Sequence, residues 1–215
     1  MRDMMIEKTE EIHRKIREMS ELSSKSIEMA MMAFISQNEK MANDVIMKDK
    51  VINAYEQEIE NLCVTFAATQ SPVASDLRRF MTVLRVVVDL ERIGDYSCNI
   101  AQIVMDLGKY GLIKPIEDLK IMESRVKEML DDSLKAYFNQ DVELAFATAE
   151  KDEVIDQLYE KIYRELLSYI KKVDDEEDQI IGLVFVGRYL ERIADHATNI
   201  CERLIYMETG NSVKF

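Results

Sequence analysis

Two stretches of twelve residues, DLERIGDYSCNI at 89–100 and YLERIADHATNI at 189–200, reveal the plan of the fold. They share seven identical residues, and each position lies 100 residues from its counterpart. A shorter match accompanies them, because KDKVIN at 48–53 and KDEVID at 151–156 share four residues of six at an offset of 103. Matches at two separate places with nearly the same offset indicate that one structural unit occurs twice in the chain.

The residues around these matches have helical character. The 215 residues include only six glycines and two prolines, and apolar residues recur at three- and four-residue steps, as at Ile12, Ile16 and Met19. Six helices are therefore predicted, the first five over approximately residues 4–34, 40–69, 71–108, 116–139 and 141–172. The sixth should follow the acidic turn VDDEED (173–178) and end at about residue 208, before Gly210.

The stretch GKYGLIKP at 108–115 is the expected boundary between the two units. It holds two of the six glycines and one of the two prolines, and the helical pattern begins again after Pro115. We therefore expect an all-α fold of two pseudo-symmetric three-helix bundles, residues 1–111 and residues 112–215. A helix of about 30 residues would be about 45 Å long, so each bundle should be elongated.

Charge and composition exclude several classes of protein. With 28 basic and 41 acidic residues the net charge is −13, which disfavours nonspecific binding to nucleic acid. No apolar run approaches the 18 or so residues that span a bilayer, and the N-terminus lacks the apolar stretch of a signal peptide. Cys63, Cys98 and Cys201 have no metal-binding spacing, so they are expected to be free thiols in a reducing cytoplasm.

Carboxylates recur at both copies of the repeated motif. Glu91 and Asp95 lie one turn apart on the same helix face, and Glu191 and Asp195 repeat the arrangement. Like charges at this spacing destabilise a helix by a few tenths of a kcal/mol. Their presence in both copies suggests that a cation compensates for the repulsion.

Two further pairs are expected to face these carboxylates across a groove between helices. They lie in the second and fifth predicted helices: Asp49 with Asn53, and Asp152 with Asp156. Four or more oxygens and no thiolate suit a hard or borderline divalent ion such as iron, manganese, zinc or magnesium. The alternative is a solvated face on which Arg92 and Arg192 neutralise the carboxylates.

Other polar residues near the motifs have simpler expected roles. The stretch QSPVASDLRR places Ser71 and Pro72 at the start of the third helix, as N-cap and first-turn residue. Asp76 and Arg78 have no counterpart before the sixth helix and are expected to form a helix cap and a salt bridge. His196 follows Asp195 but points about 100° away around the helix, so it would lie beside the site at most.

These residues carry a resemblance to the PhoU family of phosphate-uptake regulators. The stretch QSPVASDLR resembles the family's loop before its third helix, and LERIGDYSCNIA and LERIADHATNICE are similar to its two signature helices. KDKVIN and KDEVID fall where the family has its second- and fifth-helix acidic motifs. The resemblance covers almost the whole chain, with several motifs in the right order.

The resemblance implies a fold, a site and a function. The implied fold is a six-helix, pseudo-twofold pair of three-helix bundles. The implied sites are metal-binding sites for clusters of iron, zinc or manganese, held by the Glu-x-x-x-Asp pairs, which we call the ladders (Glu91 with Asp95, and Glu191 with Asp195). The implied function is non-enzymatic: a cytoplasmic regulator of phosphate uptake and phosphate-starvation signalling. It would bind the ATPase subunit of an ABC-type phosphate transporter and a sensor histidine kinase, both at the inner face of the membrane.

Three other interpretations remain open from the sequence. A carboxylate-bridged multinuclear metalloenzyme could use the ladders, although the Glu-x-x-His pairs of the usual di-iron bundles are missing. A helical bundle whose carboxylates bind nothing is the second, and an accessory protein of a different phosphate permease is the third. The sequence also leaves the oligomeric state open, including a homodimer.

Overall fold

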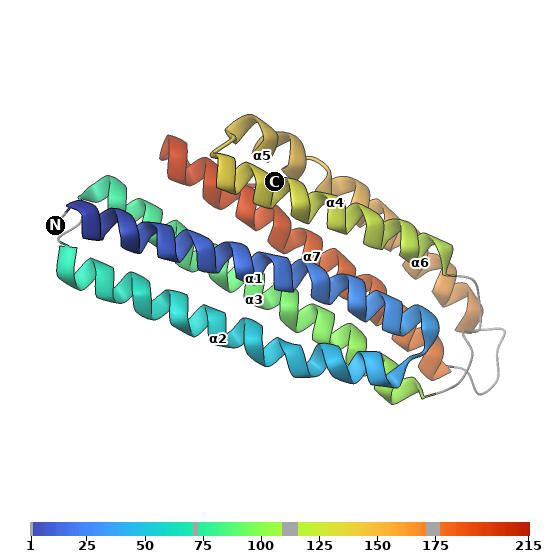
Figure 1. Ribbon diagram of the computed structural model, residues 1–215. Helices are drawn as coiled ribbons and strands as arrows, with labels where there is room; N and C mark the ends of the chain where they lie inside the picture. The colour runs from blue at the N-terminus through green and yellow to red at the C-terminus, as the bar shows by residue number, and fades with distance from the viewer. Residues whose placement is uncertain (1, 71–72, 109–115, 171–176) are drawn as a thin grey trace.

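The computed structural model describes residues 2–70, 73–108, 116–170 and 177–215, and within them it consists of helices without strands (Figure 1). The all-α prediction is therefore confirmed. The helices are α1 (Arg2–Ser36), α2 (Glu39–Gln70), α3 (Ala74–Leu107), α4 (Glu117–Asn139), α5 (Val142–Ala149), α6 (Asp152–Ile170) and α7 (Glu177–Thr209).

Most predicted helix ends agree with the structure to within a few residues. Gly210 ends α7 at a φ of 76°, and its N–H donates to Tyr206 O over 2.9 Å. The predicted cap residues Ser71 and Pro72 lie outside the described residues. Asp76 does cap α3, because its carboxylate accepts a hydrogen bond of 3.2 Å from the N–H of Val73.

The predicted fifth helix is wrong in one respect, because it is divided into α5 and α6 near Glu150 and Lys151. The N–H of Lys151 donates to Thr148 O, three residues back, and this tighter turn interrupts the α-helical pattern. The amine of Lys151 is held by Glu128 and Asp132 of α4, at 2.8 and 2.7 Å. In the first repeat the residue at the matching position, Lys48, contacts the sulfur of Met29 instead, and α2 continues unbroken.

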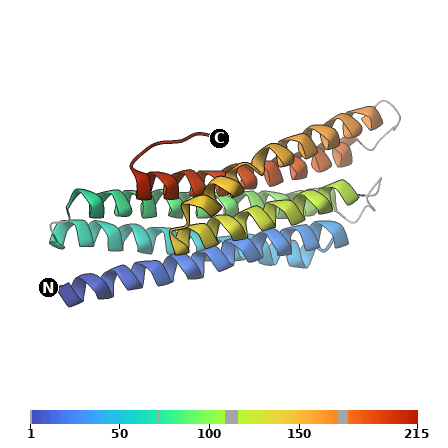
Figure 2. The ribbon, with the colours of Figure 1, turned by 90° about the horizontal axis from the view of Figure 1, so that it is seen from above.

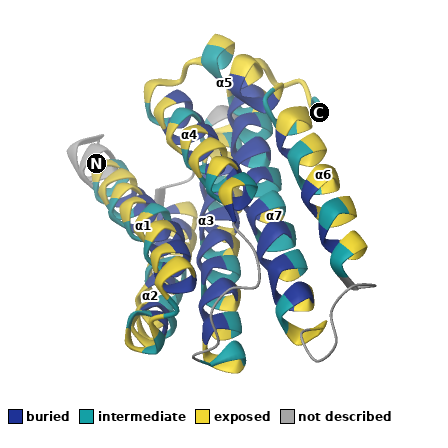
Figure 3. Ribbon diagram, turned by 90° about the vertical axis from the view of Figure 1, so that its right-hand side faces the viewer, coloured by how far each residue is buried: buried dark blue, intermediate teal, exposed yellow. Residues whose placement is uncertain are grey.

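The α3–α7 pair forms the centre of the fold. The two helices run antiparallel, and α1 and α2 pack against α3 while α4, α5 and α6 pack against α7. Figures 2 and 3 show α1 and α4 on one side of the central pair, with their buried residues facing it. Among the described helices, none covers the opposite side of the pair. We call that side the open face.

Contacts between α3 and α7 follow the sequence repeat. Tyr96 stacks on Tyr189 with ring centroids 5.8 Å apart, and His196 Nδ1 lies 2.9 Å from Asp89 Oδ1. Because Tyr189 and His196 are the counterparts of Asp89 and Tyr96, these are equivalent contacts about a pseudo-twofold axis. The backbone arrangement is thus repeated, but one of the two contacts between α3 and α7 is an aromatic stack and the other is a polar contact.

One continuous hydrophobic core runs through both repeats. It includes fully buried residues of α1, α3, α4 and α7, among them Phe34, Leu90, Met122 and Leu190. The predicted boundary between residues 1–111 and 112–215 falls at 109–115, outside the described residues, and stays a prediction. All three cysteines are free. None of the described helices has the length and apolar character needed to cross a bilayer.

We expect Asp89→Ala to lower the free energy of unfolding by about 2 kcal/mol, because it leaves the half-buried side chains of His196 and Arg203 without their carboxylate. Asp89 is only 3% exposed, and its second oxygen lies 3.7 Å from Arg203 Nε. Urea denaturation would measure the loss. Asp44→Ala, at an exposed position on α2, is the control and should stay within about 0.5 kcal/mol of wild type. Equal stability of both variants would contradict the role assigned to Asp89.

Candidate metal centres

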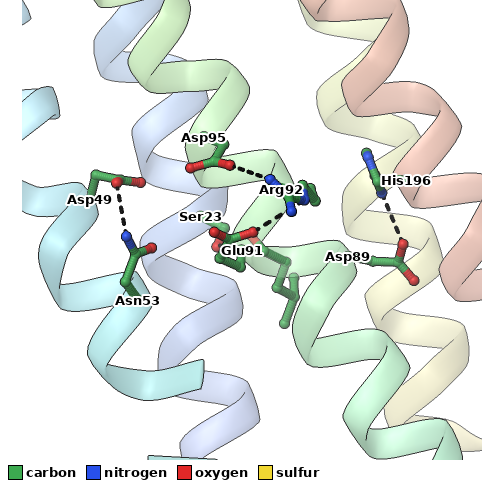
Figure 4. Close-up of polar contacts among 9 residues, drawn as sticks. Ser23, Asp49, Asn53, Asp89, Glu91, Arg92, Asp95 and His196 are labelled. Carbon is green, nitrogen blue, oxygen red and sulfur yellow. Dashed lines mark hydrogen bonds and ion pairs between the residues drawn. The ribbon is translucent and has the colours of Figure 1, made fainter. Parts of the chain in front are cut away.

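The first candidate site lies between α2 and α3. Asp49 and Asn53 project from α2 toward Glu91 and Asp95 of α3, as Figure 4 shows. The amide of Asn53 donates to Asp49 Oδ2 over 3.3 Å. Arg92 donates to Asp95 Oδ2 over 2.8 Å and lies 3.5 Å from Glu91 Oε2. The structure therefore brings together the four predicted residues of the first repeat.

The second candidate site lies between α6 and α7 and has the same plan. Its predicted residues are Asp152 and Asp156 on α6 and Glu191 and Asp195 on α7. Arg192 donates to Asp195 Oδ2 over 2.9 Å, as Arg92 does to Asp95. A further guanidinium, that of Arg188, forms an ion pair with Glu191. The equivalent position in the first repeat is Val88, so the second site has one more cation.

The carboxylates at both sites raise one another's pKa values. Burial, followed by the charge of Asp95, raises the pKa of Glu91 from 4.5 to about 7. Burial, followed by the charge of Asp195, raises the pKa of Asp152 from 3.8 to about 6. The pKa of Asp49 is also raised, by burial and then by Asp95. Such shifts arise where carboxylates are withdrawn from water and lie close to other carboxylates.

Two further carboxylates of the second site, Asp156 and Glu191, also have raised pKa values. Burial raises the pKa of Asp156, and the charge of Asp195 adds to the effect. Burial also raises the pKa of Glu191, although the nearby Arg188 acts in the opposite direction. Arginines therefore neutralise part of each cluster, as the alternative interpretation expected, and the pKa values remain raised.

Close helix packing sets the distance between the two sides of the first site. A Cβ atom at Gly94 would lie 2.9 Å from Ile52 Cδ1 and 3.2 Å from Asp49 Oδ1. Real Cβ atoms do not approach other atoms at 2.9 Å, so glycine allows α2 to come this near to α3. The side chain of Asp49 is thereby brought against the helix that carries Glu91 and Asp95.

Glu56 is a site residue that sequence reasoning missed. It lies two turns beyond Asp49 on α2, and its charge contributes to the raised pKa of Glu91. The seven-residue spacing from Asp49 was the signal that could have found it. In the second repeat the matching position is Tyr159, whose ring lies 5.8 Å from the guanidinium of Arg188. The two sites thus differ at this position, which carries a carboxylate in the first repeat and an aromatic ring in the second.

His196 does not contribute to either candidate site. Its Nδ1 contacts Asp89, a residue of the other repeat, and its ring lies 5.7 Å from that of Tyr96. Figure 4 shows the Asp89–His196 contact at the α3–α7 seam, apart from the groove that holds Asp49. The sequence predicted that His196 would lie beside the second site at most, and in the structure its side chain faces α3.

Oxygen atoms without partners at both sites fit a metal ion. Asp49 Oδ1, Asn53 Oδ1 and Asp152 Oδ1 are buried and accept no hydrogen bond. A buried oxygen left unpaired costs free energy that a hard cation would recover. As the side chains stand, however, the described residues contain no group of three or more His, Cys, Asp or Glu close enough to hold one ion. Ligation would therefore require the side chains to draw together.

We expect metal-free protein to lose stability as the pH rises from about 4.5 to about 7. Across this window the folded state keeps the proton on Glu91 while the unfolded chain has released it, so the free energy of unfolding falls. Glu91→Gln should raise Tm at pH 7.5 by roughly 3 °C, about 1 kcal/mol after allowance for partial exposure. Thermal melts in EDTA at pH 5.5 and 7.5 would measure both effects.

Glu117→Gln provides the control for this measurement, because Glu117 is 71% exposed and lies outside both sites. Its melting temperature should match that of wild type at each pH. If Glu91→Gln left the pH dependence unchanged, the raised pKa of Glu91 would be contradicted.

Comparison with known proteins identifies relatives over nearly the whole chain. A family model described as PhoU domain matches residues 16–104 and 119–204. A phosphate-specific transport system accessory protein PhoU homolog of Clostridium acetobutylicum is 37% identical over 205 residues, 95% of this chain and 94% of its own. A homolog of Aquifex aeolicus is 37% identical over 210 residues, 98% of this chain and 95% of its own.

Solved structures agree with the sequence relatives. The crystal structure of PhoU from Pseudomonas aeruginosa matches with a TM-score of 0.91 at 31% identity, covering 95% of this chain and 98% of that one. The phosphate transport system regulatory protein PhoU from Streptococcus pneumoniae matches with a TM-score of 0.89 at 32% identity, covering 96% and 97%. The family model matches both repeats and the helix arrangement is shared with the solved structures, so the chain belongs to the PhoU family.

Proposed function

We propose that this protein is a cytoplasmic regulator of phosphate uptake and phosphate-starvation signalling that binds metal clusters at two equivalent carboxylate sites. Membership of the PhoU family supports an accessory role in phosphate transport, since the curated relatives are named as accessory proteins of the phosphate-specific transport system. The chain would act by binding partners rather than by catalysis. Its partners would be an ABC-type phosphate transporter, through its ATPase subunit, and a sensor histidine kinase.

The observation that carries the metal proposal is the buried, unpartnered oxygen that recurs at equivalent positions. Asp49 Oδ1 in the first repeat and Asp152 Oδ1 in the second are both buried and both face crowded carboxylates, and the hydroxyl of Thr198 is a neighbouring donor for the Asp152 carboxylate. Leaving these oxygens unpaired costs free energy in both repeats, and a bound cation would recover it. Solvated, arginine-neutralised faces would explain Asp95 and Asp195 but not these two oxygens.

Each set of ligands spans two helices, so a bound metal would act on the packing between them. Asp49 and Asn53 would hold it from α2, and Glu91 and Asp95 from α3. In the second repeat Asp152 and Asp156 of α6 would be joined to Glu191 and Asp195 of α7. A multivalent cation supplies neutralising charge there, which removes the carboxylate repulsion and lowers their pKa values. Iron, zinc and manganese all accept such oxygen-rich ligand sets.

We expect protein purified without an affinity tag or chelator to contain stoichiometric iron, zinc or manganese by elemental analysis. Glu91→Gln with Asp95→Asn should remove about half of the metal, and Glu191→Gln with Asp195→Asn the other half, because the two sites are separate. The control is Glu117→Gln with Glu160→Gln, which neutralises two exposed carboxylates and should leave the metal content unchanged.

The metal content of wild type and of the two double variants separates the interpretations. Metal-free wild-type protein would refute the metal clusters and leave the carboxylates as charged docking faces. Loss of all metal from either double variant would mean one shared site, contrary to two independent ones. Because the measurement concerns metal only, neither result would alter the assignment to the PhoU family.

A cellular test addresses the regulatory role. Deletion of the gene should raise expression of a phosphate-starvation reporter in phosphate-rich medium, and the wild-type chain should restore repression. The chain with all four ladder carboxylates neutralised should fail to restore it if metal supports signalling. Co-purification with the transporter ATPase subunit and the kinase would identify the partners. An unchanged reporter after deletion would contradict the regulatory proposal.

A further inference from the structure

A pocket of about 170 Å³ lies where the two repeats meet, toward the end of the molecule at which α1 begins (Figure 1). Its walls come from α1, α2 and α3 of the first repeat and from α4 and α7 of the second. Ile12 and Val83 line it from the first repeat, and Phe138 and Met207 line it from the second. The eight candidate metal ligands lie elsewhere on their helices. A ligand in this pocket would therefore contact both repeats without touching either candidate metal centre.

Most of the pocket lining is apolar or aromatic. Val83 is buried, at 5% exposed. The ring of Phe66 packs against that of Phe80 with centroids 4.4 Å apart, and the ring of Tyr137 meets that of Phe138 edge to face at 5.4 Å. Aromatic walls favour a flat apolar ligand, and a cavity of about 150 Å³ accommodates one benzene ring. The pocket therefore fits a ligand body of roughly one aromatic ring.

Positive charge gathers at the opening of the pocket. Arg79 and His13 line it and are exposed, and the guanidinium of Arg17 lies 4.1 Å from the centre of the Phe138 ring. Partial burial lowers the pKa of His13, and the charges of Arg79 and then Arg17 lower it further. Asp76 is the acidic residue among the described lining residues. Two arginines and one carboxylate leave a net positive charge beside a neutral imidazole, in a chain whose net charge is −13.

Polar groups at the pocket have hydrogen bonds left to donate. Neither Arg79 nor Arg17 forms an ion pair with any residue that the structure describes. The carboxylate of Asp76 accepts instead from the N–H of Val73, at 3.2 Å. Tyr137 is 5% exposed, and within the described part of the chain its hydroxyl makes no hydrogen bond. Burial raises the pKa of Tyr137, so the hydroxyl keeps its proton. Unpaired donors around an apolar pocket suit a ligand that carries an anionic acceptor.

The second repeat has a pocket of similar size whose charge is opposite. Its volume is about 190 Å³, and Leu183, the counterpart of Val83, lies in its wall. Its polar lining consists of Glu117, Asp118 and Glu165, so it would repel an anion. The cationic opening is therefore specific to the first pocket and is not imposed by the repeated backbone.

We propose that the pocket between the repeats binds a small organic acid, a single carboxylate attached to one aromatic ring. The ring would pack among Phe80, Val83 and Phe138, and the carboxylate would pair with Arg79 at the opening. This site goes beyond the proposed function, because it uses none of the metal ligands and requires no protein partner. By joining α1 and α3 to α4 and α7, the acid would stabilise the contact between the two repeats.

Charge and size favour this ligand class over three others. An inorganic anion would pair with Arg79 and leave the aromatic walls unfilled. A neutral aromatic molecule would fill the walls and leave the arginine without an acceptor. A nucleotide carries two or more negative charges and a sugar besides its base, which exceeds both the charge and the volume of the pocket.

Calorimetric titration of the full chain with phenylacetate would test the proposal. EDTA in the buffer prevents metal at the carboxylate sites from binding the probe. We expect a dissociation constant of roughly 0.1 mM, as for an efficient ligand of about ten non-hydrogen atoms. Phenylacetamide has the same shape without the charge and should bind about 10-fold more weakly. Inorganic phosphate at the same concentrations should not bind measurably.

Three variants locate the binding site. Arg79→Gln should weaken phenylacetate binding about 10-fold and leave phenylacetamide binding unchanged, because it removes only the ion pair. Arg85→Gln alters another exposed arginine of α3 outside the pocket and is the matched control, with unchanged affinity for both probes. Val83→Leu introduces the residue found at the counterpart position and should weaken both probes by filling the pocket. Circular dichroism would verify that each variant is folded.

Several results would overturn the proposal. They are a wild-type chain that does not bind phenylacetate, phosphate that binds as tightly as phenylacetate, and an Arg79→Gln loss matched by Arg85→Gln. A folded Val83→Leu variant with wild-type affinity would place the acid outside the pocket and would also overturn it. Because these titrations are done without metal, each result is independent of the metal content and of the regulatory role.

Discussion

The antiparallel packing of α3 against α7 positions all the other helices of the structure. Every other helix packs against one of these two, and the pseudo-twofold axis passes between them. The seam is held by a stacked Tyr96–Tyr189 pair and by the buried Asp89 in contact with His196. Because α2 and α6 are positioned against α3 and α7, the same packing determines where the two carboxylate sites form and that they resemble each other.

The carboxylate sites combine destabilising features that a cation would relieve. Buried acidic residues ordinarily pair with a base or bind a metal, and here arginines on one side reach only some of the oxygens. Burial is the main cause of the raised pKa values of Glu91 and Asp152, and the charges of Asp95 and Asp195 add to it. The sites are equivalent in plan but not in detail, since Glu56 of the first is replaced by Tyr159 and Val88 by Arg188 in the second.

The open face links the repeated backbone to its divergent side chains. An exact duplication would give the two ends of the face identical side chains. The repeats have diverged at this face, where position 78 is arginine and the position 100 residues later is aspartate, and both positions remain helical. The fold therefore tolerates exchange of exposed charges because its stability comes from the buried side of the α3–α7 pair.

The repeat and most of the helices could be predicted from the amino-acid sequence, because the spacings that reveal them are local to a helix. The eight candidate ligands rest on the same kind of spacing, and metal binding by them stays a prediction. Residues four apart share a face whatever the tertiary structure, so Glu91 with Asp95 and Asp152 with Asp156 could be paired in advance. Contacts between helices could not be predicted in this way. Asp89 meets His196 across 107 residues, Glu56 joins the first site, and the carboxylates of α4 hold Lys151 where the predicted fifth helix breaks. Such contacts depend on how helices rotate and approach one another, which the spacing along a single helix does not specify.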